Sequence, residues 1–187
     1  MTPRTVFGLR PTLAGLLHGL ASAADGKRTL RFTLQHQLQT NWCWAAVATS
    51  AAGFFDRATT WGQCTLVNAE LGQAGCCNDG SSGACNVPWY LDRALDRTGN
   101  LKSKSSGTVP WTKIRTEIDA GRPVGARIGW RGGGGHFVVL TGYRKAGKVE
   151  EVEVQDPWTG RSSLPLDVFK TNYKNAGTWT HTYLTRK

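Results

Sequence analysis

The pattern of apolar and polar positions divides the chain into a helical first half and a β second half. Apolar residues at every second position over residues 28–34 predict a short strand. Residues 41–55 are rich in alanine and apolar on nearly every side, which is typical of a buried helix, and Asn41 can cap its N-terminus. Three further helices are predicted at Cys64–Leu71, Pro88–Thr98 and Pro110–Ala120, and the latter two begin with proline and are followed by glycine.

The second half of the chain carries β-branched and aromatic segments separated by turns that contain glycine. These segments predict strands at Val124–Trp130, Phe137–Tyr143, Val149–Gln155 and Thr178–Leu184. Residues Ser103–Gly107 are predicted to cross between the two halves. Helices followed by antiparallel strands predict an α+β domain in two subregions, with a cleft between them.

The N-terminal residues differ in character from the rest. Two arginines precede a largely apolar stretch, and Ala21-Ser-Ala23 resembles the small-residue site at which secretory signal peptides are cleaved. We predict a signal peptide or leader over residues 1–23, followed by one exported domain over residues 24–187. An amphipathic leader helix or a short pro-segment is the alternative, because a histidine interrupts the apolar stretch.

Composition narrows the functional classes. The chain has 187 residues, 40% of them hydrophobic, which suits one compact domain. Its net charge of +10 falls to +8 without residues 1–23, which hold two arginines and no acids. The basic residues occur singly or in pairs, so a nucleic-acid partner is not expected, whereas attraction to an anionic surface or substrate is the simplest use of the charge. No stretch approaches the roughly 20 apolar residues of a membrane helix, so we expect no membrane insertion.

Four of the five cysteines crowd into one segment, and Cys43 stands apart. In an exported protein those four predict two disulfides. A bridge between the adjacent pair would be strained, so each of the two should bond to one of the outer cysteines, with the connectivity left open. A zinc site or four free thiols are the alternatives, although the segment lacks histidine and C-x2-C spacing. The disulfide candidates are Cys64, Cys76, Cys77 and Cys85.

Cys43 lies in the first turn of the predicted buried helix. There the helix dipole and a nearby imidazolium would favour its thiolate, the form that attacks carbonyl carbons. Packing as a small buried hydrophobe is the simpler interpretation of an isolated cysteine. Gln37 lies six residues upstream, and its amide could donate to an oxyanion alongside the Cys43 backbone N–H.

The second half supplies a base and an acid. His136 follows four glycines and begins an apolar strand, and Asp156 ends the next strand, from which an antiparallel neighbour could bring its carboxylate to the imidazole. A hairpin with an incidental histidine and a simple turn acid are the competing interpretations. His36 and His181 are rival bases that lack the glycine loop.

Three motifs in this order resemble those of compact bacterial papain-like cysteine proteases, among them secreted effector proteases and peptidases that clip bacteriocin leaders. They are Gln37-x5-Cys43 with Trp42-Cys-Trp-Ala-Ala, then Gly135-His-Phe-Val-Val-Leu-Thr-Gly-Tyr, then Asp156-Pro-Trp. The resemblance covers roughly residues 30–187 of the sequence. It implies a papain-like fold, in which a helical subdomain with a central Cys-bearing helix packs on an antiparallel β subdomain.

The resemblance also implies roles: Cys43 as nucleophile, His136 as base, Asp156 holding the histidine, Gln37 as oxyanion donor, and no cofactor or metal. The expected function is a cysteine endopeptidase that cleaves a protein or peptide substrate through a thioester on Cys43. An amidase acting on peptidoglycan, a transpeptidase or deamidase, and a catalytically silent binding module are the alternatives. We expect Trp42 and Trp130, with Trp44, to line the cleft.

Overall fold

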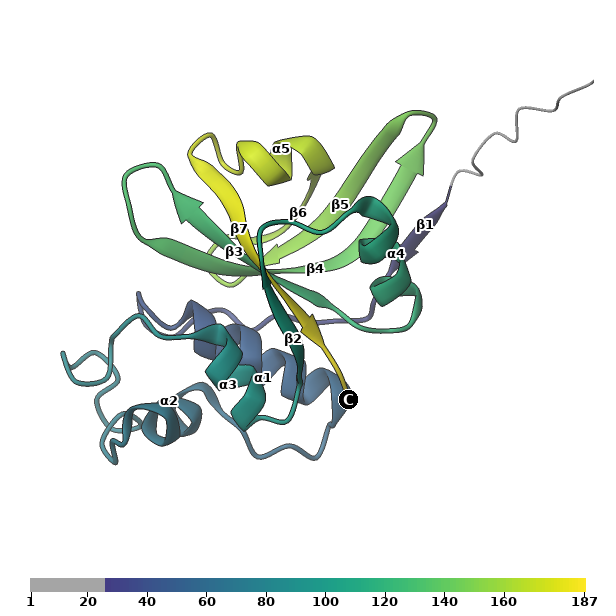
Figure 1. Ribbon diagram of the computed structural model, residues 1–187. Helices are drawn as coiled ribbons and strands as arrows, with labels where there is room; N and C mark the ends of the chain where they lie inside the picture. The colour runs from purple at the N-terminus through teal and green to yellow at the C-terminus, as the bar shows by residue number, and fades with distance from the viewer. Residues whose placement is uncertain (1–25) are drawn as a thin grey trace, which may run out of the picture.

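The computed structural model describes residues 26–187 and shows the predicted α+β architecture, with a helical half below a twisted sheet (Figure 1). The predicted signal peptide over residues 1–23 lies outside the described residues. Within residues 26–187, no helix is long and apolar enough to cross a membrane. The helical half contains α1 (Cys43–Phe55), α2 (Gln63–Leu71) and α3 (Leu91–Arg97).

Helix α1 is the buried centre of the fold. Its residues from Cys43 to Ala52 are all buried, and it packs against α2, α3 and one strand of the sheet, β4 (Gly135–Ala146). The helix therefore presents its first turn to the junction of the two halves. The prediction that Asn41 caps α1 was wrong: its side-chain nitrogen donates to the carbonyl of Asn86 at 2.8 Å, and its backbone N–H donates to the Asn86 side chain at 2.9 Å.

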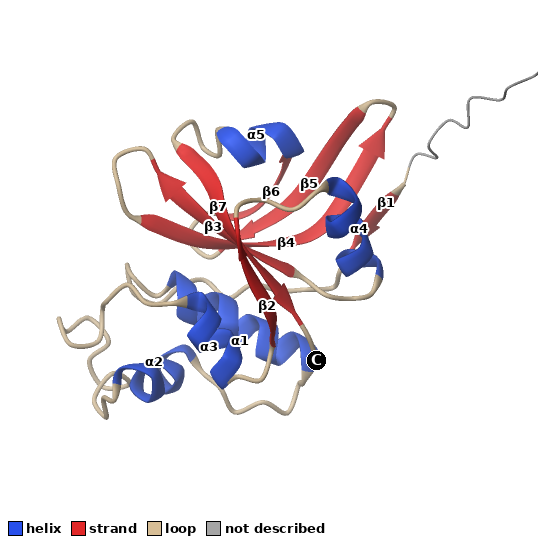
Figure 2. Ribbon diagram, in the orientation of Figure 1, coloured by secondary structure: helices blue, strands red, loops and turns tan. Residues whose placement is uncertain are grey.

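The β half is a seven-stranded sheet in which every pairing of strands is antiparallel (Figure 2). The strand order is β2-β7-β3-β4-β5-β6, and β1 pairs with β4. Two short helices, α4 (Trp111–Asp119) and α5 (Leu166–Thr171), pack against the sheet. The remaining strands are β1 (Lys27–Thr29), β2 (Leu101–Ser106), β3 (Val124–Trp130), β5 (Val149–Asp156), β6 (Gly160–Pro165) and β7 (Gly177–Thr185).

The strand predictions hold best where one side of the strand is buried. Strand β3 has the predicted bounds, and β4, β5 and β7 extend beyond theirs. Residues 28–34 keep the predicted alternation of burial, but only the first two belong to β1. The segment Ser103–Gly107, predicted to cross between the two halves, is mostly the edge strand β2, which pairs with β7. Strand β6 and helix α5 were not predicted.

The four clustered cysteines form two disulfides, Cys64–Cys77 and Cys76–Cys85, and Cys43 is free and buried. The adjacent pair is thus bonded to the two outer cysteines, as expected, and the structure supplies the connectivity. The cross-linked segment packs on the start of α1. The indole N–H of Trp42 donates to the carbonyl of Cys85 at 2.8 Å, and a Cβ at Gly80 would lie 2.6 Å from the Trp42 ring.

This packing corrects the prediction for Trp42. Its side chain is only 1% exposed, in the core beneath the disulfide-bonded segment, and it does not line a cleft wall. Because Trp42 immediately precedes Cys43, its buried side chain instead attaches the first turn of α1 to the cross-linked segment.

Candidate active site

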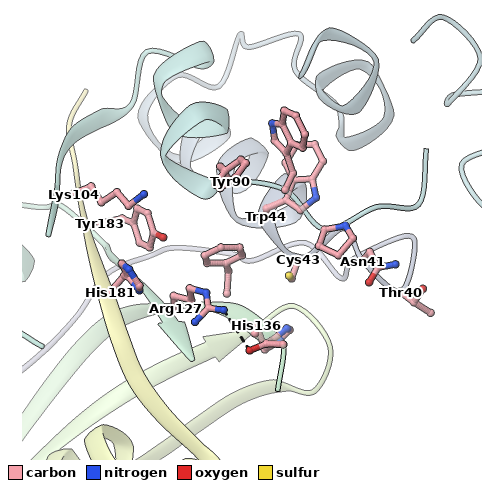
Figure 3. A pocket seen from close by; sticks show the side chains of 15 residues that line it. Thr40, Asn41, Cys43, Trp44, Tyr90, Lys104, Arg127, His136, His181 and Tyr183 are labelled. Atoms are coloured by element: carbon pink, nitrogen blue, oxygen red, sulfur yellow. Dashed lines mark hydrogen bonds between the residues drawn. The ribbon is translucent and has the colours of Figure 1, made fainter. Parts of the chain in front are cut away.

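The two halves of the fold bring Cys43, His136 and Asp156 together. Cys43 is the first residue of α1, His136 is the second residue of β4, and Asp156 is the last residue of β5. Because β4 and β5 are antiparallel neighbours, the start of one lies beside the end of the other. The Nε2 of His136 lies 2.8 Å from an Asp156 carboxylate oxygen, and the Cys43 thiol is close enough to the imidazole to raise its pKa. Cys43 and His136 lie across from one another in the cleft (Figure 3).

The surroundings of His136 favour its protonated form. Burial alone would lower the pKa of the imidazole, but the hydrogen bond to Asp156, the neighbouring Cys43 thiol and the charges of both groups outweigh burial and raise the pKa to about 9. Since a carboxylate only accepts hydrogen bonds, Nε2 carries the proton toward Asp156 and Nδ1 is left for Cys43. The arrangement suits an imidazolium beside a thiolate.

Asp156 is fixed by the turn that follows it. The backbone N–H groups of Trp158 and Thr159 donate to the carboxylate oxygen that also faces His136, at 2.8 and 3.2 Å. Burial would raise the pKa of this carboxyl, but the hydrogen bond and charge of His136 and the Trp158 N–H hold it well below its usual range. The backbone of the Asp156-Pro-Trp158 motif therefore helps to orient the carboxylate and to keep it ionised.

Two further residues bind the other oxygen of Asp156, and no sequence motif predicted either of them. The Tyr173 hydroxyl donates at 3.0 Å, and the Lys174 ammonium lies 3.2 Å away. Burial and the nearby carboxylate raise the pKa of Tyr173 well above its usual value, so it stays a hydrogen-bond donor. Both residues come from the turn between α5 and β7, where Lys174 and Asn175 have positive φ.

Gln37 lies beside the site, and its two amide hydrogens are already engaged. Its side-chain nitrogen donates to the carbonyls of Gln39 and Thr40, each at 2.8 Å, while its buried carbonyl oxygen has no hydrogen-bond partner among residues 26–187. The backbone N–H of Gln37 donates to the carbonyl of Pro157, next to Asp156. The residue thus ties the segment before α1 to the turn after β5.

A cleft of about 750 Å³ runs past Cys43 and His136 between the helical half and the sheet (Figure 3). Its helical wall includes Trp44 and Tyr90, and its sheet wall includes Phe137 and Tyr183. A smaller cavity of about 280 Å³ also borders His136 and is lined by Trp130 and Trp158. Trp130 stacks on the imidazole, with ring centroids 6.1 Å apart.

The rival histidines lie apart from the triad. His36 stacks on the exposed ring of Trp158, with centroids 5.6 Å apart. His181 lines the far part of the large cleft, where burial and then the charges of Arg127 and Lys104 lower its pKa. Among residues 26–187, no group of three or more histidine, cysteine, aspartate or glutamate side chains could hold a metal ion.

Comparisons with known proteins place the chain in a family and identify its fold. The profile of the Peptidase_C39-like family matches residues 29–182, although no curated protein matches the chain. The fold resembles that in a structure on antibody cross-reactivity between the mite allergens Blo t 1 and Der p 1, with 12% identity, a TM-score of 0.56, and coverage of 91% of this chain and 74% of that one.

Two further solved structures resemble the chain. Digestive procathepsin L 3 of Tenebrio molitor larval midgut has 12% identity and a TM-score of 0.51, with coverage of 90% of this chain and 72% of that one. A double glycine motif protease from an AMS/PCAT transporter, in complex with the leader peptide, has 17% identity and a TM-score of 0.48, with coverage of 86% and 95%. The fold is papain-like.

Proposed function

Since the chain belongs to the Peptidase_C39-like family and is a cysteine peptidase at the level of that family, we propose that it is an endopeptidase whose catalytic residues are Cys43, His136 and Asp156. One observation carries the proposal. The His136 imidazole bonds to Asp156 through Nε2, and it faces the Cys43 thiol at the start of α1 across the cleft (Figure 3). This is the relation of nucleophile, base and orienting group that covalent catalysis needs.

In the acylation step, the Cys43 thiolate attacks the carbonyl carbon of the scissile peptide bond, and the carbonyl oxygen becomes an oxyanion. As the tetrahedral intermediate collapses, the C–N bond breaks and the His136 imidazolium gives its proton to the leaving amine. The amine product leaves and the acyl group remains on Cys43 as a thioester. Asp156 holds the ring in place and stabilises its charged form before the transfer.

The oxyanion is stabilised by the Cys43 backbone N–H and the Gln37 side-chain amide. Both Gln37 hydrogens bond to backbone carbonyls, so the role requires one of these bonds to be exchanged for the oxyanion. This exchange is favourable because a hydrogen bond to the charged oxyanion is stronger than one to a neutral backbone carbonyl. Because the side-chain oxygen of Gln37 makes no hydrogen bond within residues 26–187, no bond at that oxygen has to break when the amide group turns toward the oxyanion.

In the deacylation step, His136 is neutral and takes a proton from water as the water oxygen attacks the thioester carbonyl. The C–S bond then breaks, the acid product leaves, and thiolate and imidazolium are restored. Trp130 and Trp158 cover the triad on the side of the smaller cavity, and Trp158 also holds Asp156 through its backbone.

We also propose that the protein acts outside the reducing cytosol. The two disulfides of the described domain support this, because disulfides persist in oxidising compartments. The predicted signal peptide over residues 1–23 agrees with it.

The activity is tested by incubating the purified protein with an internally quenched peptide library and, separately, with peptidoglycan, under mild reduction. Endopeptidase activity predicts new peptide termini with the wild type and none with Cys43→Ala. Release of peptidoglycan fragments with all peptides intact would instead assign an amidase to the same triad, and no product from either substrate would favour a binding module.

A further inference from the structure

The part of the large cleft that lies away from Asn41 is strongly polar. Lys104 from β2, Arg127 from β3 and His181 from β7 all point into it, beside the Tyr183 ring (Figure 3). The opposite wall at this end is the aromatic segment around Tyr90. None of the basic residues takes part in the hydrogen bonds of the triad.

The register of the sheet brings these side chains to one place near His136. Arg127 is paired with His181 on β7 and with Phe137 on β4, and Lys104 is paired with Tyr183. Since Phe137 directly follows His136, the Arg127 backbone lies one strand away from the histidine. A substrate side chain close to the scissile bond can therefore reach the guanidinium.

Charge pairing singles out Arg127 among the three. The Lys104 ammonium forms an ion pair with Asp92 of α3 at 3.1 Å. The lowered pKa of His181 keeps its ring neutral at pH 7. Arg127 donates only to neutral acceptors, the Thr180 hydroxyl at 3.0 Å and the Gly134 carbonyl at 3.3 Å, and within residues 26–187 no carboxylate forms an ion pair with it.

The glycine loop before His136 holds the guanidinium in place. A Cβ at Gly135 would lie 2.5 Å from a terminal nitrogen of Arg127, so the group lies flat against the glycine backbone. A Cβ at Gly129 would lie 3.4 Å from the other terminal nitrogen. With the Thr180 and Gly134 contacts, these positions orient a half-buried fork of donors toward the cleft, the geometry that matches a carboxylate.

We propose that this end of the cleft is a subsite for an acidic side chain of the peptide substrate, with the aspartate or glutamate carboxylate bound by Arg127. The inference rests on the proposed function, because the peptide must be held for attack by Cys43. The cleft volume of about 750 Å³ leaves room for such a side chain. Asp92 does not compete for Arg127, because Lys104 neutralises it.

The test uses internally quenched peptides that carry Glu or Gln in turn at each position around the scissile bond. We expect one position at which kcat/KM with Glu exceeds that with Gln by about 10–100-fold, the value of a hydrogen bond to a charged group. In Arg127→Met this ratio falls to roughly one. Arg127→Glu, assayed also with a peptide that carries Lys at the same position, is expected to cleave the Lys peptide faster than the Glu peptide. Arg161→Met is the matched control: it removes an equal charge from an arginine paired with Glu153 outside the cleft, and keeps the ratio.

The outcomes separate the subsite from the proposed function. Cleavage with no preference for Glu, or a preference that survives in Arg127→Met, overturns the subsite and leaves the peptidase in place. If no peptide is cleaved, the proposed function fails, and binding of the same Glu and Gln peptides to Cys43→Ala, measured by fluorescence anisotropy, decides the subsite. Equal affinities there overturn it, whereas Arg127-dependent tighter binding of one Glu peptide supports it.

Discussion

Two buried carboxylates of this protein, Asp156 and Glu117, are ionised for the same reason and serve different ends. Their side chains are 2% and 1% exposed. Burial would raise the pKa of each, and hydrogen-bonding partners outweigh it, so that the pKa of Glu117 falls to about 2 and that of Asp156 lies well below its usual range.

The difference lies in the partners. Glu117, on α4, forms ion pairs with three basic side chains: Lys102, Lys113 and Arg122. Asp156 faces an imidazole whose proton can leave, together with Tyr173, Lys174 and backbone N–H groups. A buried carboxylate held by lysine and arginine side chains stabilises the fold, and one held against a histidine can support proton transfer.

The largest effect should come from removing the acid beside the histidine. Asp156→Asn keeps the side-chain volume but loses the charge that stabilises the imidazolium. We expect kcat/KM to fall by about 10²-fold or more, the scale of acid–base contributions. Steady-state kinetics on a cleaved peptide measure it, and a variant with wild-type kcat/KM would remove Asp156 from the mechanism.

The same substitution at the structural acid should separate activity from stability. Glu117→Gln leaves three basic side chains around a neutral amide, and we expect the free energy of unfolding to fall by about 2 kcal/mol. Urea unfolding measures this change, and kcat/KM below the transition should stay within about twofold of wild type, because the site is untouched. An equal loss of activity in Glu117→Gln and Asp156→Asn would show that both carboxylates act through folding alone.

The histidine beside Asp156 and the structural acid Glu117 predict losses at opposite ends of the pH range. The pKa of His136 is raised from 6.5 to about 9, so the stability that its proton adds is complete below 6.5 and is lost as pH rises through about 9. Activity should fall about tenfold per unit above that pH, because the imidazolium is gone. Glu117 adds stability above its ordinary pKa of 4.5 that is lost as pH falls toward 2. An activity profile with no alkaline limb near pH 9 contradicts the assigned pair.

The smallest predicted effect comes from the hydroxyl that binds Asp156. Tyr173→Phe removes one donor, which concentrates negative charge on the carboxylate and raises the pKa of His136 further. We expect kcat/KM to fall only a few-fold, about the scale of one neutral hydrogen bond, and the alkaline limb to move upward. Tyr143→Phe is the control, since that hydroxyl donates to Asp119, away from the site. Identical profiles for both variants would reduce Tyr173 to packing.

The sequence could predict the triad because each member lies in a local motif. Cys43 and His136 were found from their helix and glycine-loop contexts, and the structure brings them together with Asp156 because β4 and β5 are neighbours. The partners of Asp156 were not predictable, since Tyr173 and Lys174 arrive from the turn between α5 and β7, some 17 residues later. Contacts of this kind depend on tertiary packing, and they produce no periodic pattern of apolar and polar residues in the sequence.

Missed fold elements have a similar cause. The edge strands β2 and β6 are almost entirely exposed, so they lack the alternation of apolar residues that reveals a half-buried strand. The cleft-facing arginine was missed for the opposite reason: Arg127 interrupts the buried pattern of β3 as a single polar residue, and only the sheet register shows that it shares a cleft with His136.

The most direct test is covalent labelling of the folded protein with a peptide-like epoxide under mild reduction, with the modified residue mapped by mass spectrometry in the wild type and in His136→Ala. An imidazole-activated thiolate predicts rapid modification of Cys43 in the wild type and little in the variant. No modification of the wild type, or equal modification of both proteins, would contradict the assignment of Cys43 and His136 as nucleophile and base.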